Sequence, residues 1–90
     1  MRMILWEQFR DRLLRQYPQG ISSIPGEELE FEVQTLMTNH RDLAKQLLLE
    51  ARMSTMEITL RVEQALLEGR RNYAALLSEV GLEQPDPPEE

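Results

Sequence analysis

The sequence contains no cysteine, so it can hold neither a disulfide bond nor a thiolate zinc site. It contains one histidine, His40, and therefore no second histidine to share a metal ion. The Glu-x-x-His half-site of diiron helical bundles also fails, because Met37 stands where that motif needs a glutamate. These gaps predict a protein without a metal ion or other cofactor.

Long apolar runs are missing as well. A helix that spans a bilayer needs about 20 consecutive apolar residues, and no uncharged run in this chain approaches that length. Apolar residues make up 41% of the chain and charged residues 29%, which is close to the usage of an ordinary globular domain. The composition predicts a folded cytoplasmic protein that does not enter the membrane.

Groups suited to catalysis are scarce. The four serines have only His40 as a possible base, and none of them lies in a recognisable nucleophile motif. The adjacent glutamates Glu27 and Glu28 fall in the first turn of an expected helix, where carboxylates are favoured in any case. The sequence therefore predicts no catalytic residue and a protein that is not an enzyme.

Apolar residues at steps of three and four predict a first helix over residues 4–16. Leu5, Trp6, Phe9 and Leu13 lie on about half of its circumference. Pro18 ends it, since proline lacks a backbone N–H and pushes the preceding residue out of the helical region.

A heptad-like pattern predicts a second, coiled-coil-like helix over residues 25–51. Its apolar seam consists of Leu29, Val33, Leu36, His40, Leu43 and Leu47. The motif from Ser54 to Glu57 matches a capping box, which starts a third helix over residues 55–80. Its seam includes Ile58, Val62, Ala65, Gly69, Tyr73, Leu76 and Val80, and Gly81 caps its end. One continuous helix from about residue 25 to residue 80 is the alternative.

The fold class is accordingly all-α, with a short N-terminal helix and a long antiparallel helical hairpin in a single domain over residues 1–82. The acidic, proline-rich residues 83–90 form a disordered tail. The first helix covers only half of a hairpin that is roughly 40 Å long, so an apolar flank remains. A two-fold homodimer in a helical bundle buries this flank. Alternatively, the first helix and the loop residues Ile21 and Ile24 fold over it and complete a monomeric bundle.

The predicted function is that of a helical protein–protein interaction module, such as an adaptor, assembly factor or small regulator, which also binds itself as a homodimer. Aromatic and exposed aliphatic residues dominate the energetics of protein interfaces. His40, on the apolar seam, is a buried or interfacial residue that makes assembly sensitive to pH. The predicted partner-binding residues are Trp6, Phe9, Phe31, Leu49 and Tyr73.

The alternative function is that of a nucleic-acid-associated regulator with an arginine-rich face. A net charge of −6 opposes attraction to phosphate, which makes nucleic acid the less favoured partner. Pairing of the arginines with nearby carboxylates is the simpler interpretation. The face would consist of Arg10, Arg12, Arg15, Arg70 and Arg71.

Overall fold

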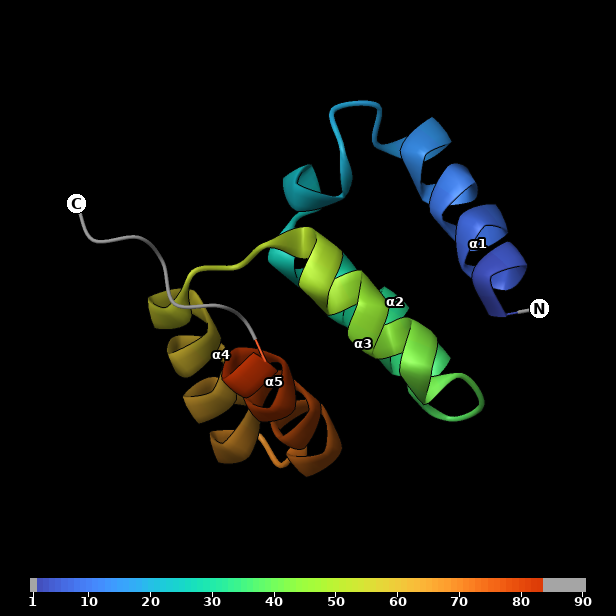
Figure 1. Cartoon of the computed structure of the whole chain (residues 1–90). Helices are drawn as coiled ribbons and strands as arrows, with labels where there is room; N and C mark the ends of the chain where they lie inside the picture. Colours follow the sequence, from blue (N-terminus) through green and yellow to red (C-terminus); the bar gives the residue numbers. More distant parts are fainter. Residues whose placement is uncertain (1, 84–90) are drawn as a thin grey trace. The chain divides into compact units, whose positions relative to one another are not determined.

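The computed structural model describes residues 2–83 and shows an all-α protein, as the sequence predicts (Figure 1). Five α-helices and one short 3₁₀ segment make up this part of the chain. In chain order they are α1 (Arg2–Gln16), η1 (Ile21–Ser23), α2 (Gly26–Met37), α3 (Arg41–Ala51), α4 (Thr55–Leu67) and α5 (Arg71–Glu83).

The chain divides into two compact units, Met1–Arg52 and Met53–Glu90. In the first unit α2 and α3 pack against each other as a helical hairpin, and in the second α4 and α5 do the same (Figure 1). Each hairpin therefore has an apolar core of its own. A single domain over residues 1–82 and a dimeric bundle stay predictions.

The first unit contains α1 and η1 in addition to the α2–α3 hairpin. Leu13 of α1 is fully buried, and Ile21 at the start of η1 and Ile24 directly after it are 4% and 7% exposed. The segment η1 contacts both α1 and α3. Burial of Ile21 and Ile24 agrees with the alternative in which loop residues cover part of the apolar surface within one chain.

Two helix ends lie where local sequence signals place them. The first helix ends at Gln16, two residues before Pro18, although it begins at Arg2 and not at residue 4. Ser54 caps α4, because its hydroxyl accepts a hydrogen bond from the Glu57 N–H at 3.1 Å. Arg52 adopts a left-handed conformation with φ of 58° after α3 ends. The break between residues 51 and 55 is confirmed, and the continuous helix is wrong.

The prediction of an unbroken helix over residues 25–51 is also wrong. The chain leaves the helix at Thr38–Asn39–His40, where three polar residues with modest helix propensity follow one another. The His40 N–H still donates to the Leu36 carbonyl at 2.7 Å, which closes the end of α2. His40 itself has φ of −140° and stands immediately before α3.

The predicted helix over residues 55–80 is interrupted in the same way. Gly69 has φ of 83°, which is the left-handed region that glycine adopts without steric cost, and the Arg70 N–H donates to the Ala65 carbonyl at 2.7 Å. Gly81 does not cap α5, since the helix continues to Glu83. The rest of the predicted tail lies outside the described residues. Two short hairpins thus replace one long hairpin.

The two hairpins share a local design. In each, a three-residue turn is followed by an arginine that starts the second helix. The residues two and three positions after this arginine both belong to the core. Leu43 and Ala44 form this pair in α3, and Tyr73 and Ala74 form it in α5. A second pair of buried leucines follows in both helices, Leu47 and Leu48 in α3 and Leu76 and Leu77 in α5.

Gly69 and Gly81 should respond oppositely to substitution by alanine. At Gly69 no described atom lies within 4 Å of an added Cβ, so Gly69→Ala causes no steric clash with other residues. It should lower the free energy of unfolding by about 1–2 kcal/mol, because alanine disfavours the positive φ of this position. At Gly81, inside α5, an added Cβ meets Ile58 Cγ2 at an ordinary 3.5 Å. Gly81→Ala should therefore raise the free energy of unfolding by up to about 1 kcal/mol. Urea denaturation measures both, and a gain in stability from Gly69→Ala would contradict this account of the turn.

Candidate functional site

The aromatic residues of α1 form a half-buried cluster. The ring centroids of Trp6 and Phe9 lie 6.2 Å apart with an interplanar angle of 37°. The Arg12 guanidinium carbon stands 5.0 Å from the centre of the Phe9 ring, within the range of a cation–π interaction. Neither ring is fully exposed, so both contribute to the surface of the first unit and to its packing.

The other three predicted partner-binding residues lie in different environments. Phe31 is 69% exposed on α2, on the side away from the buried Leu29 and Val33. Leu49 of α3 is half-buried. Tyr73 is only 2% exposed and belongs to the core between α4 and α5. Placing Tyr73 on a binding surface was wrong, because the true helix start at Arg71 turns this residue toward α4.

His40 does not lie on an apolar seam. It is an exposed residue of the α2–α3 turn, so the prediction of a buried seam histidine is wrong, whereas an interfacial position stays a prediction. The cause is the break in the helix, which removes His40 from the periodic pattern of Leu36 and Leu43. A pH-sensitive seam therefore has no structural basis at this position.

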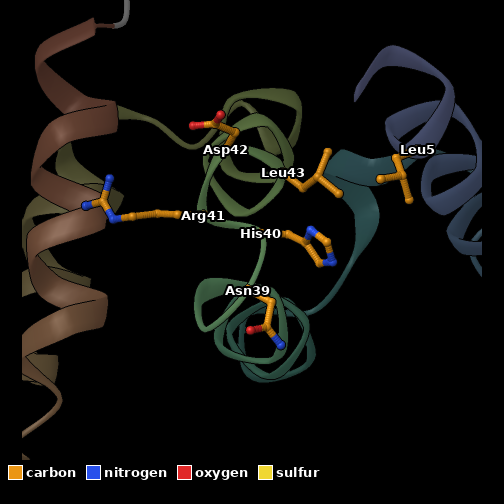
Figure 2. Close-up of a pocket in the computed structure, with 6 residues that line it drawn as sticks. All are labelled: Leu5, Asn39, His40, Arg41, Asp42 and Leu43. Carbon is orange, nitrogen blue, oxygen red and sulfur yellow. The ribbon is translucent and has the colours of Figure 1, made fainter. Parts of the chain in front are cut away.

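His40 instead lines a pocket of about 230 Å³ in the first unit (Figure 2). Figure 2 shows the His40 ring and the Leu43 side chain on the side that faces Leu5 of α1, whereas Arg41 extends away from Leu5. Asn39 and Asp42 complete the lining. The pocket thus combines two leucines with the imidazole of His40, the amide of Asn39, and the charged side chains of Arg41 and Asp42.

Most of the arginines proposed for nucleic-acid binding are held by carboxylates. In the first unit, Arg10 Nη2 lies 3.2 Å from Glu50 Oε2, which links α1 to α3. Arg12 Nη2 lies 3.3 Å from Glu32 Oε1, which links α1 to α2. In the second unit, Arg70 Nη1 lies 2.8 Å from Glu68 Oε1. Arg15 and Arg71 are exposed.

Tyr17 adds a second polar link to α2, which is the third between the α1 segment and the α2–α3 hairpin. Its hydroxyl, just beyond the end of α1, donates to Glu28 Oε1 in the first turn of α2. The hydrogen bond to Glu28 is the main reason that the pKa of Tyr17 lies above its ordinary value. Burial and the negative charges of Glu28 and Glu32 raise this pKa further. The contacts of α1 with the hairpin therefore include a polar set as well as buried Leu13.

The most exposed apolar surface on any one described helix lies on α4. Met56, Leu60 and Leu67 are 73%, 59% and 88% exposed, and their spacings of four and seven residues place them on one side of the helix. We call these three residues the α4 stripe. The buried residues Ile58 and Ala65 lie on roughly the opposite side and pack toward α5. Both sides of α4 are therefore apolar.

The sequence contains the signal for the α4 stripe, but the predicted long helix obscures it. With helix 55–80 taken as continuous, a single seam from Ile58 to Val80 draws attention away from the remaining apolar residues. Recognising Gly69 as a turn leaves a helix of thirteen residues, in which Met56, Leu60 and Leu67 have no role in the core. A second apolar periodicity within so short a helix would have pointed to this surface.

Within residues 2–83, no cluster of three or more His, Asp or Glu side chains is arranged to hold a metal ion. In the same range, no helix has both the length and the apolar character that crossing a bilayer requires. Comparison with protein-family models, with curated proteins and with solved structures gave no match. The surfaces of the two units are therefore the features that bear on function.

Proposed function

We propose that this chain is a non-enzymatic helical protein–protein interaction module, serving as an adaptor, assembly factor or small regulator. The observation that carries the proposal is the α4 stripe, where three large apolar side chains are exposed on one side of a helix whose other side is already packed. Contiguous exposed apolar surface on a folded protein usually marks an association site. The cytoplasmic location expected from the sequence belongs to the same proposal.

Self-association as a homodimer is the second part of the proposal. Phe31 supports it, because an aromatic ring that is 69% exposed contributes little to the first unit's own core. Aromatic residues are among the strongest contributors when an interface buries them. Trp6, Phe9 and Leu49 are half-buried and can add contact area beside such an anchor.

The molar mass in solution tests the homodimer. We expect light scattering after size-exclusion chromatography to give twice the chain mass at micromolar concentrations. Phe31→Ser should weaken the dimer by at least about tenfold, as expected for an anchor residue. Leu82→Ser is the matched control, since Leu82 is 87% exposed but lies on α5. A monomer over the whole concentration range would remove the homodimer from the proposal.

Regulation through nucleic acid has less support. Arg10, Arg12 and Arg70 already contact carboxylates, and the chain carries a net charge of −6. Binding to phosphate would require these pairs to open, which lowers the gain from releasing counterions. Among residues 2–83, no contact favours nucleic acid over a protein partner.

A further inference from the structure

The α4 stripe contains one charged position. Glu63 lies between Leu60 and Leu67 on the same side of α4, three residues from the first and four from the second. It is exposed, and no ion pair or hydrogen bond of its side chain is formed within residues 2–83. A surface that is otherwise apolar thus carries a carboxylate whose charge is not compensated locally.

The neighbouring carboxylates differ from Glu63. Glu57 lies 3.4 Å from the Arg61 Nε, and Glu68 lies 2.8 Å from the Arg70 Nη1. Arg61 of α4 and Arg70 of the following turn are therefore already paired with carboxylates other than Glu63. A hollow of about 410 Å³ beside the stripe is lined, among the described residues, by Glu63, Leu66 and Leu67. Leu66 is itself 54% exposed, so apolar surface borders the free carboxylate.

A second copy of the chain is a poor occupant for this surface. If α4 paired with itself about a two-fold axis, both Glu63 carboxylates would be buried in an interface to which neither stripe brings a cation. Burying a carboxylate without a partner opposes association strongly. An anionic lipid surface is also disfavoured, because it brings no cation to Glu63 and the chain carries a net charge of −6.

We infer that the α4 stripe is the docking site for an amphipathic helix of another protein, whose apolar side is flanked by Lys or Arg residues. Leucine-like side chains at spacings of four and seven would contact Met56, Leu60 and Leu67. One basic side chain would pair with Glu63. This inference rests on the proposed function and specifies the chemistry of the partner at one of its surfaces.

Two synthetic helical peptides of about 18 residues, roughly five turns, provide the probe. Both carry leucine at positions i, i+4, i+7 and i+11, and their flanking positions are all lysine in one peptide and all glutamate in the other. Fluorescence anisotropy of labelled peptide is measured as the full chain is added. We expect saturable binding of the lysine peptide in the micromolar range, and at least about thirtyfold weaker binding of the glutamate peptide.

Matched variants separate docking on the stripe from general attraction between a basic peptide and an acidic protein. Leu67→Ser should weaken binding of the lysine peptide by at least about tenfold. Leu82→Ser should leave it unchanged, although the two leucines are 88% and 87% exposed. Glu63→Gln should weaken binding about three- to tenfold and reduce its dependence on salt. Asp11→Asn removes one exposed negative charge from α1. It should change neither the affinity for the lysine peptide nor the dependence of that affinity on salt.

Several results would overturn the inference. Equal binding of the two peptides, or equal losses in Leu67→Ser and Leu82→Ser, would show that neither the basic flank nor the stripe selects the ligand. Loss of dimer mass in Leu67→Ser would make a second copy the occupant and would still support an interaction module. Binding to anionic phospholipid vesicles that Leu67→Ser abolishes would assign the stripe to a membrane surface and would count against the proposed function too.

Discussion

Tyr73→Ala should unfold the α4–α5 hairpin, although the sequence alone suggested that this residue binds a partner. Tyr73 is 2% exposed, and its ring fills the core that α5 shares with α4. Truncating a buried aromatic side chain to alanine costs about 3–5 kcal/mol, because apolar contacts are lost and a cavity remains. At roughly 0.05–0.15 kcal/mol per residue, a unit of this size has a free energy of unfolding of only about 2–6 kcal/mol, so most of the hairpin's stability would be lost.

Urea denaturation and peptide-level hydrogen exchange measure this effect. We expect a large drop in the urea midpoint and a loss of protection in the peptides that cover α4 and α5. Tyr73→Phe is the matched variant, because it keeps the ring and removes only the hydroxyl, with an expected cost of about 1 kcal/mol. Native stability of Tyr73→Ala together with lost partner binding would restore the interface role predicted from the sequence.

The helix boundaries that could be predicted depend on strong local signals. Pro18 and the capping motif at Ser54 and Glu57 act within a few residues, through a missing N–H in one case and a side-chain hydrogen bond in the other. Neither signal depends on what the rest of the chain does. The end of α1 and the start of α4 were therefore predicted correctly.

The breaks at residues 38–40 and 68–70 escaped prediction because an antiparallel hairpin can imitate a continuous helix. Leu36 and Leu43 both face the hairpin core, and their separation of seven residues equals about two helical turns. The apolar pattern therefore continues across the turn without a change of phase. Only the weak helix propensity of Thr38, Asn39 and His40, and the special backbone freedom of Gly69, distinguish the two structures.

Errors in the predicted sites follow from these missed turns. A continuous second helix places His40 on the apolar seam, whereas the turn exposes it. A continuous third helix leaves Tyr73 as one residue of a long seam that a partner could share, whereas the short hairpin buries it. The exposed position of Phe31, away from the buried side of α2, depends only on helical periodicity within a single short helix, and the missed turns do not change it.

Leu47→Ala is the other substitution that should lower the free energy of unfolding strongly. Comparing it with a substitution of Leu49 distinguishes core positions from surface positions on α3. Leu47 is fully buried, and Leu49 two residues later is half-buried. Because successive helical residues point about 100° apart, the two side chains lie on different sides of α3. Truncating a buried leucine costs about 2–5 kcal/mol, of which part is the cavity left behind.

Leu49→Ala is the internal control for that substitution, since it removes the same number of atoms from the same helix. We expect Leu49→Ala to cost less than half as much stability as Leu47→Ala, because its side chain is already partly hydrated. Urea denaturation gives both free energies, and light scattering gives the effect of Leu49→Ala on self-association. Equal stability losses would place Leu49 in the core of the first unit and would remove it from any binding surface. A small stability loss with a weakened dimer would instead establish Leu49 as an interface residue, which is the role that its half-buried position next to the α2–α3 core permits.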